Sequence, residues 1–410
     1  MSRHASPQVV AKELLSWIGL EVVSCKELQT LWAGYGQICA IDARPLLSEE
    51  DAQRTKRQGT VHKSQALILK IVAPPHGLHD ESHLRKVFSY EVEQHFYDEV
   101  APTLEGLPLA KCVVSTSKFP LKAAAAGLEN LTASVLTDLR PRYPVAGEKR
   151  AVLSSEQVHS ALSWLARFHG SYWNSPKPDL CDLIQPPLQE IQQRTKSKSS
   201  NRRGLWLNGG YTYLATRLSE YNALLEDSSS EWSQTFCQPV DGTSVSVAEL
   251  AASFLTPTGR AFETYLHGDV KSENLFSTES GHQVAFFDFQ YTGLGLGVCD
   301  LAKLFTCSVP LQMLQASTGE PDELNMSEQE RYLLDQYRRE LLNGGSMTNV
   351  PLYDWREFRR HWETALVDWC RFQASWGFWG NTKWLQARVR SILHNGDWLQ
   401  WIKNETRGSI

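Results

Sequence analysis

The sequence predicts an α+β protein with a small N-terminal unit that contains a sheet and a larger, mainly helical C-terminal unit. Its 410 residues exceed the usual size of a single hydrophobic core. Short apolar runs separated by glycine and proline occupy the first third, which is typical of strands and turns. Farther along, apolar residues recur mainly at helical spacing. We therefore expect an N-terminal unit over 1–138 and a C-terminal unit over 139–410.

The N-terminal unit is expected to contain helices and strands in alternation. Residues 8–19 have the pattern of a short amphipathic helix, and 28–47 that of two strands joined by a tight turn. Residues 66–74, "ALILKIVAP", predict a buried strand. Residues 81–102 space their apolar side chains as a helix does and end at a proline. Residues 131–141 predict a further strand followed by a breaker.

Helices dominate the remainder of the chain. Residues 154–173 place their apolar side chains on one helical face. Two polar stretches, 48–65 and 192–204, are expected to be exposed loops, and the basic one at 192–204 is a weak nucleic-acid signal. Near the C-terminus four tryptophans recur at every seventh residue, which predicts one face of a long helix; they are Trp355, Trp362, Trp369 and Trp376.

Composition narrows the class of protein. With 42% hydrophobic and 21% charged residues and a net charge of -5, the chain is typical of a folded protein without a nucleic-acid partner. The eight cysteines are scattered without any C-x-x-C pair, which favours reduced thiols. No signal peptide and no apolar run of the ~20 residues needed to cross a bilayer is present. We expect a cytoplasmic protein with no membrane span; oligomeric state is not indicated.

The stretch "YLHGDVKSENLFS", residues 265–277, carries the strongest chemical signal. His267, Asp269 and Asn274 have the order and spacing H-x-D-x-x-x-x-N of a kinase catalytic loop. Phosphoryl transfer needs a carboxylate aligned with the acceptor hydroxyl, a role that suits Asp269. The amide oxygen of Asn274 is a hard ligand suited to Mg²⁺.

A predicted hairpin follows the catalytic loop and ends at Asp288. Residues 274–290 alternate two short apolar strands around the turn "STESGH", which would return the chain to Asn274. Asp288 lies in "FFDFQ", and burial of its carboxylate without a partner would be costly. A shared divalent metal is the natural compensation.

Candidate phosphate-binding groups lie upstream. Lys70 interrupts the apolar strand at 66–74. Its ammonium could pair with ATP phosphates and with a glutamate of the next helix, Glu91 or Glu93. Alternatively, the side chain could extend from a strand end into solvent. Gly34 and Gly36 in "WAGYGQ" offer a turn that could cover phosphates, although two glycines are a weak signal.

These motifs resemble a known superfamily. "HGDVKSEN" looks like the catalytic loop of protein kinases, but 199 residues separate Lys70 from Asp269 and no A-P-E sequence follows Asp288. The arrangement is similar to the aminoglycoside phosphotransferase and choline kinase superfamily, most of all to its ecdysteroid-kinase-like (CHK) branch. "LARFHGSYW", "VLTDL" and "VEQHFYDEVAP" resemble motifs of that branch, and the similarity runs from about residue 28 to 310.

The resemblance implies a bilobal protein-kinase-like fold that binds ATP and Mg²⁺ between its lobes. It implies a catalytic role for Asp269 and metal coordination by Asn274 and Asp288. It also favours Glu93 over Glu91 as the partner of Lys70. It further places Thr137, Asp138 and Leu139 at the adenine. Lys271 would be either a phosphate contact or an exposed loop lysine. His267 and Asp300 would support the catalytic loop, and His169 would have a structural role in packing.

The chain departs from the superfamily pattern in its sparse glycine loop, its long polar stretch at 48–65 and its Gln290. The identity of the acceptor stays open. Trp376 or Trp379 could form a pocket wall for a flat hydrophobic alcohol or, through cation–π contacts, for a cationic amine. Most tryptophans of this region are expected in the core. Three acidic residues could supply counter-charge for a cation, but a solvated position on a helix surface is favoured for them: Asp354, Glu363 and Asp368.

We therefore expect an ATP- and Mg²⁺-dependent kinase that transfers the γ-phosphate to a hydroxyl of a small molecule. A choline- or ethanolamine-like kinase is the nearest alternative. A protein kinase is disfavoured because an activation segment is missing. A non-catalytic pseudokinase that only binds ligands is the alternative from a different class.

Overall fold

The structure, a computed structural model, describes residues 6–31, 34–47, 64–75, 80–173, 175–197, 203–316, 319, 321–343 and 353–407. The chain divides into two compact units. The first comprises residues 1–105 and 109–141, and the second comprises residues 106–108 and 142–410. No helix among the described residues is long and apolar enough to cross a membrane.

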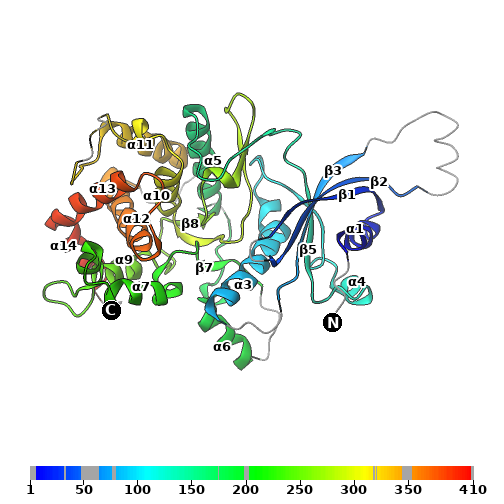
Figure 1. The fold of residues 1–410 in the computed structure, drawn as a ribbon, viewed down its shortest axis with the longest axis horizontal. Helices are drawn as coiled ribbons and strands as arrows, with labels where there is room; N and C mark the ends of the chain where they lie inside the picture. The colour runs from blue at the N-terminus through cyan, green and yellow to red at the C-terminus, as the bar shows by residue number, and fades with distance from the viewer. Residues whose placement is uncertain are drawn as a thin grey trace. The chain divides into compact units, whose positions relative to one another are not determined.

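The first unit is built on a five-stranded antiparallel sheet with the order β1-β2-β3-β5-β4 (Figure 1). β3 lies at the centre, where it pairs with β2 on one side and β5 on the other. Helices α1 and α3 pack on this sheet. The strands are β1 (Leu20–Thr30), β2 (Gly36–Pro45), β3 (Gln65–Val72), β4 (Cys112–Ser115) and β5 (Thr132–Thr137), and the helices are α1 (Pro7–Ser16), α3 (Glu81–His95) and α4 (Pro120–Ala125).

Alternation along β3 separates its two faces. Leu67, Leu69 and Ile71 are buried in one core with the apolar face of α1. Because successive side chains of a strand point to opposite faces, Lys70 lies on the other face of the sheet. That face carries α3, so the strand and the helix together determine the surroundings of the lysine.

The second unit has two small sheets and a helical body. One sheet has the antiparallel order β10-β9-β6, and the other has the order β7-β11-β8, in which β7 and β11 are parallel. The strands are β6 (Val145–Ala146), β7 (Trp206–Asn208), β8 (Glu263–Leu266), β9 (Leu275–Ser277), β10 (Val284–Phe286) and β11 (Gly293–Leu296).

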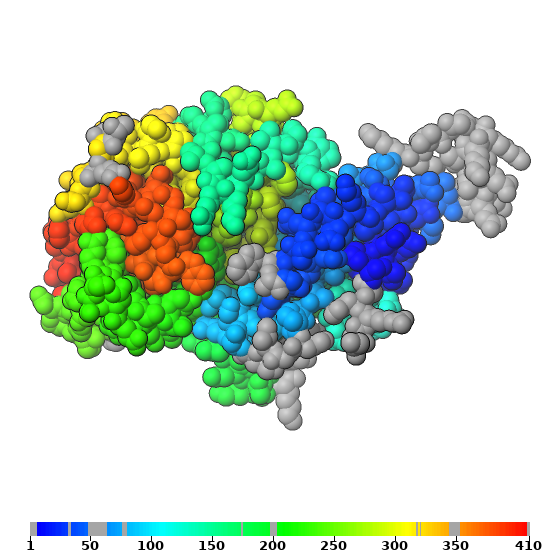
Figure 2. Space-filling model, in the orientation of Figure 1, coloured from blue at the N-terminus to red at the C-terminus, as the bar shows by residue number. Residues whose placement is uncertain are grey.

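The helices of this unit pack around α12 and α5. α12 contacts α10, α13, α9 and α7, and α5 packs against α11. Figure 2 shows the C-terminal helices, in orange and red, beside the green segment that contains α7 to α9. The helices are α5 (Ser155–Trp173), α6 (Pro187–Ser197), α7 (Leu218–Glu226), α8 (Glu231–Cys237), α9 (Val247–Leu255), α10 (Val298–Cys307), α11 (Glu328–Asn343), α12 (Trp355–Trp376), α13 (Thr382–His394) and α14 (Gly396–Glu405).

Two sequence expectations need correction. The first strand of the pair expected within 28–47 begins earlier, at Leu20, and continues directly from the turn after α1. The stretch 192–204 was expected to be a loop, but its residues 192–197 complete helix α6. Glu190 on this helix accepts a hydrogen bond from Arg194 one turn later, which supports the helix. Residues 48–63 of the other polar stretch and 198–202 lie outside the described residues.

The seven-residue tryptophan spacing does mark one long helix, α12. Trp362 and Trp369 are buried in the core, whereas Trp376 at the helix end is 56% exposed. The eight cysteines are all free thiols, as the scattered spacing predicts.

Candidate active site

The stretch 265–277, the candidate catalytic segment that we call the catalytic loop, is held by the carboxylate of Asp300, near the start of α10. Its Oδ2 accepts the backbone N–H of His267 at 2.7 Å, and its Oδ1 accepts that of Gly268 at 3.0 Å. Burial alone would raise the pKa of Asp300, but the hydrogen bond from His169 and the nearby cationic groups lower it below its ordinary value. A carboxylate is therefore maintained where it receives these N–H groups.

Gly268 is required by both conformation and space. Its φ is +84°, and a Cβ atom added there would lie 2.3 Å from the carbonyl oxygen of Tyr291 and 2.7 Å from the amide nitrogen of Gly210. The buried Lys303, one turn after Asp300, donates to the carbonyl of Gly268 at 2.7 Å. The catalytic loop is thus clamped from both sides by α10.

His169 supports Asp300 from α5. Its Nε2 lies 3.2 Å from Asp300 Oδ2, and its Nδ1 lies 2.7 Å from the hydroxyl of Tyr337 on α11. With the tyrosine donating to Nδ1, the Nε2–H donates to the carboxylate. The imidazole links three helices and does not face a reacting group, in agreement with the structural role expected of it.

The imidazole of His267 is fully buried beneath the loop. Its Nε2 lies 2.9 Å from the carbonyl oxygen of Phe287, and its Nδ1 accepts the backbone N–H of Asp269 at 3.3 Å. Burial lowers the pKa of His267, so the ring is neutral and one nitrogen serves as donor and the other as acceptor. This histidine ties the loop to the hairpin that follows.

The side chains of Asp269, Asn274 and Lys271 meet at one place. Asn274 donates from its amide nitrogen to the backbone oxygen of Asp269 at 2.8 Å and to its Oδ2 at 2.9 Å. Lys271 contacts the same Oδ2 at 3.1 Å and Glu273 at 2.8 Å. Burial lowers the pKa of Lys271, but the two carboxylates outweigh burial and raise it above its ordinary value. Lys271 therefore remains a cation beside Asp269.

Strand pairing places Asp288 near Asn274. β9 and β10 pair with Leu275 opposite Phe286, and the N–H of Phe287 donates to the carbonyl of Asn274 at 3.0 Å. Asp288 comes next, with φ of +66°, an uncommon conformation for a residue with a side chain. Backbone strain of this kind is concentrated at functional sites.

These residues fit a magnesium ion. The amide nitrogen of Asn274 is engaged by Asp269, which leaves its Oδ1 as the group that can face a cation. Mg²⁺ is commonly held by one or two protein oxygen ligands together with substrate phosphates. The described residues contain no cluster of three or more His, Cys, Asp or Glu that could hold a metal ion.

In the first unit, Lys70 and Glu93 form a buried ion pair. Lys70 Nζ lies 2.5 Å from Glu93 Oε2, and their side chains are 11% and 7% exposed. The ring of Tyr90 lies beneath the ammonium at 5.4 Å. Of the two glutamates considered, Glu93 is thus the one in contact with Lys70. A buried pair of this kind is costly to desolvate, so it is weak support for stability and is more typical of a functional constraint.

The glycine turn between β1 and β2 has a packing explanation. A Cβ at Gly36 would lie 1.9 Å from the carbonyl oxygen of Ile71, so close strand pairing alone requires glycine there. Gly34 has φ of +72°, and no described atom lies within 4 Å of a Cβ added there, which fits an open turn. Trp32 in the same turn lies outside the described residues.

The segment expected to receive adenine follows β5. The N–H of Thr137 donates to the carbonyl of Lys111, and that of Asp138 donates to the carbonyl of Ala66. The Leu139 amide makes no hydrogen bond to any described residue. Leu139 is therefore the backbone donor of this segment most available to a ligand. The meeting of Lys70 with Asp269 and Asp288 involves two separate units and stays a prediction.

A match to a known protein family shows which family the chain belongs to. The model of the ecdysteroid kinase-like family matches residues 51–320, more than half of the chain. The chain belongs to that family. This ecdysteroid kinase-like protein is therefore by family a small-molecule kinase. Its α+β organisation, with a sheet in the N-terminal unit and a mainly helical C-terminal unit, is the one expected from the sequence. Kinases of this family use ATP with a divalent metal.

The solved structures that match the chain include three small-molecule kinases. An amicoumacin kinase is 13% identical, with coverage of 97% of both chains and a TM-score of 0.39. A macrolide 2'-phosphotransferase from Brachybacterium faecium is 11% identical, with coverage of 90% and 91% and a TM-score of 0.42. A choline kinase from Cryptosporidium parvum is 11% identical, with coverage of 96% and 91% and a TM-score of 0.39. None of the curated proteins compared with the chain matches it. The assignment of the ecdysteroid kinase-like protein rests on the family match.

Sequence reasoning missed two supports of the catalytic loop. Lys303 follows Asp300 by three residues in "CDLAKLF", a spacing that puts both on one helical face. That spacing could have indicated that the two residues act together. Tyr337 had no comparable signal, because its partner His169 is 168 residues away.

Proposed function

We propose that this ecdysteroid kinase-like protein transfers the γ-phosphate of ATP to a hydroxyl of a small molecule. Asp269 orients the hydroxyl and accepts its proton, while Asn274 and Asp288 hold Mg²⁺ on the phosphates. Lys70, fixed by Glu93, contacts phosphate, and the Leu139 amide serves the adenine. Bound Mg²⁺ would neutralise the charge that develops on the transferring phosphoryl group.

One observation carries this proposal: the Asn274 amide bonds both the backbone and the carboxylate of Asp269. The residue that would bind metal and the residue that would bind the acceptor are thereby fixed to each other. Preorganisation of this kind matters because phosphoryl transfer is catalysed mainly by positioning and electrostatics. Lys271, which remains a cation, offers a further positive charge at the reacting group.

An aromatic cluster lies near Asp269 in the same unit and supports an acceptor pocket there. Tyr211 and Tyr291 have ring centroids 5.0 Å apart. Burial raises the pKa of Tyr211 well above its ordinary value, and the charge of Asp269 adds to the shift, which places the two side chains within electrostatic reach. Phe372 and Trp376, at the end of α12, stack on each other and continue this surface.

The guanidinium of Arg217 already lies against the rings of this cluster, where a cationic acceptor would have to bind. Its guanidinium carbon lies 4.9 Å from the ring centroid of Trp376, 5.4 Å from Phe372 and 5.7 Å from Tyr211. The guanidinium is also bonded to the Tyr211 carbonyl at 2.7 Å and to Glu220 at 2.8 Å. A second cation on these rings would meet like charge.

The three acidic residues considered as counter-charge for a cationic acceptor have other partners. Asp354 caps the N-terminus of α12 by accepting the Glu357 N–H. Glu363 pairs with Arg359 and Arg360 on its own helix, and Asp368 pairs with Arg371. These contacts favour an uncharged alcohol as acceptor over a choline- or ethanolamine-like amine.

The test is transfer of labelled phosphate from ATP in a metabolite extract, with identification of the molecule that gains it. The control is Asp269→Asn, which should bind ATP with nearly unchanged affinity and turn over slower by orders of magnitude, because the carboxylate acts in the transition state. Stabilisation by ATP and Mg²⁺ without transfer to any molecule would refute turnover and favour the pseudokinase alternative. Efficient transfer to choline or ethanolamine would refute the uncharged acceptor.

A further inference from the structure

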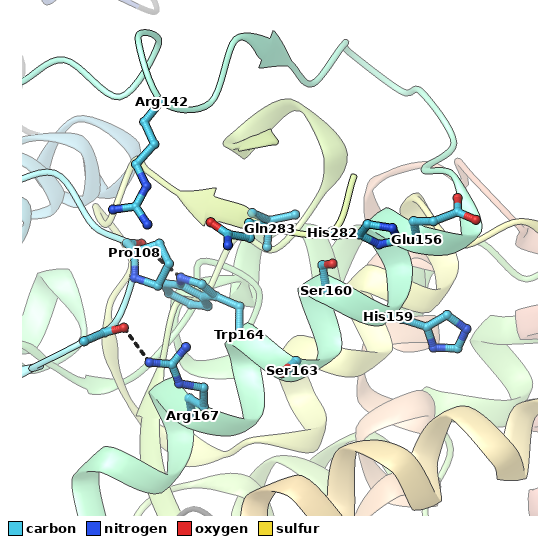
Figure 3. A pocket seen from close by; sticks show the side chains of 12 residues that line it. Pro108, Arg142, Glu156, His159, Ser160, Ser163, Trp164, Arg167, His282 and Gln283 are labelled. Carbon is cyan, nitrogen blue, oxygen red and sulfur yellow. Dashed lines mark hydrogen bonds between the residues drawn. The ribbon is translucent and has the colours of Figure 1, made fainter. Parts of the chain in front are cut away.

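A cavity of about 620 Å³ lies in the second unit on the side of α5. Figure 3 shows it between α5, the turn that joins β9 to β10, and the segment around Pro108. None of its described lining residues belongs to the candidate active site. A cavity of this size is in the range that accommodates a whole small molecule.

Two guanidinium groups border the cavity without a carboxylate partner among the described residues. Arg142 is exposed and lies over the ring of Tyr143 at 5.5 Å. Arg167 donates to the carbonyl of Gly106 at 2.5 Å, which anchors it at the rim. In Figure 3 both side chains extend beside Pro108, from opposite sides of the opening.

Further hydrogen-bonding side chains line the remainder of the cavity. The amide of Gln283 and the imidazole of His282 come from the hairpin turn, and Ser160 comes from α5 (Figure 3). Among the described lining residues Glu156 is the one carboxylate, and it accepts a hydrogen bond from the hydroxyl of Ser154. The cavity therefore presents an excess of positive charge and of hydrogen-bond donors.

We propose that this cavity binds a phosphate monoester of metabolite size. Two guanidinium forks complement the two charges and several acceptor oxygens of such a group, for which arginine is the best-suited side chain. The lining also contains Pro108, Val284 and the edge of Trp164, apolar surface that suits the organic part of the ligand. Free inorganic phosphate would fill only a fraction of the space.

A ligand here lies next to the support of the metal-binding hairpin. The indole of Trp164 donates to the carbonyl of Pro108 at 3.0 Å. Its ring lies 4.8 Å from that of Phe286 and 6.2 Å from that of Phe289, on either side of Asp288 in the chain. Binding in the cavity should therefore slow hydrogen exchange in α5 and β10.

The experiment is calorimetric titration of the full chain with glucose 6-phosphate, AMP, inorganic phosphate and citrate. The variant Arg142→Gln with Arg167→Gln removes both charges and keeps an amide that can donate to Gly106. Lys149→Gln with Arg339→Gln removes two exposed charges elsewhere in the same unit and serves as the matched control. We expect at least one monoester to bind the unmodified chain. Its affinity should be about tenfold or more weaker for the Arg142/Arg167 variant and unchanged for the control variant.

Hydrogen exchange then locates the ligand. Protection of α5 and β10 amides by the bound monoester is expected. The proposal is overturned if the monoester binds the Arg142/Arg167 variant as tightly as it binds the control variant, or if no monoester binds. It is also overturned if citrate binds more tightly than the monoesters, or if the bound monoester protects only other segments. Because no acceptor and no turnover are involved, this result is independent of the proposed kinase reaction.

Discussion

Replacement of Gly268 by alanine is predicted to slow phosphate transfer about 100-fold and to destabilise the protein. The new Cβ would lie 2.3 Å from the Tyr291 carbonyl oxygen, where ordinary contacts begin at 3.4 Å, so the loop or its neighbour must move by about 1 Å. A displacement of that size at catalytic groups can cost roughly 100-fold in rate. The left-handed conformation adds about 1–2 kcal/mol and overpacking about 1–3 kcal/mol to the loss of unfolding free energy.

Gly259 provides a matched control for this prediction. Its φ is +85°, nearly the same as the +84° of Gly268, but nothing lies within 4 Å of an added Cβ. Gly259→Ala therefore has the conformational cost alone, about 1–2 kcal/mol, and should leave turnover unchanged. The difference between the two variants isolates the contact with Tyr291.

The assay combines denaturant unfolding with ADP release at saturating Mg²⁺ and ATP in the presence of the metabolite extract. We expect Gly268→Ala to be about 1–3 kcal/mol less stable than Gly259→Ala. If the two variants lose the same stability and both turn over normally, the close approach of Gly268 to Tyr291 does not constrain the catalytic loop, and the reasoning fails.

Three further predictions concern other parts of the molecule. Asp288→Asn, which tolerates a positive φ, should abolish the part of ATP-induced thermal stabilisation that depends on Mg²⁺; an unchanged Mg²⁺ effect would remove Asp288 from the metal site. Tyr337→Phe leaves Nδ1 of His169 without its donor and should cost about 1–3 kcal/mol in unfolding free energy, with kcat lowered and the KM for ATP unchanged; equal changes in kcat and KM would argue against a role in positioning the loop. Burial lowers the pKa of His361 to about 3. Between that value and its ordinary 6.5 the unfolded state binds more protons, so the free energy of unfolding should fall by about 1.4 kcal/mol per pH unit on acidification. His361→Gln should flatten this slope, and an identical slope in the variant would contradict the prediction.

The family and the α+β fold class were predictable from local sequence because each depends on short, continuous patterns. Alternation and glycine punctuation identify strands, and the catalytic loop has a fixed internal spacing. The contact between Lys70 and Glu93 was predictable only in part: the local pattern left Glu91 and Glu93 open, and the family resemblance favoured Glu93, which the structure places against Lys70.

The supports of the loop were less accessible because they depend on contacts between distant segments. Tyr337 reaches the catalytic loop only through His169 and Asp300, a path across three helices. Arg217 likewise could not be related to the tryptophan at 376, although the two lie in one cluster. The error at 192–197 has a different cause: a polar, serine-rich composition resembles a loop, but helix α6 extends through it as a surface helix.

The hairpin β9–β10 has a consequence for how related kinases can vary. Its two strands bring Asn274 and Asp288 toward each other through backbone pairing, and the turn closes that register with a hydrogen bond from the N–H of Thr278 to the carbonyl of Gln283. A change in the length of the turn would therefore shift the strand register and move Asp288 relative to Asn274. Searches for distant members should therefore keep the gap between the asparagine and the second aspartate nearly constant, and a reporter peptide is better placed away from this tip, because its Gly281 carbonyl accepts the hydroxyl of Ser160 on α5.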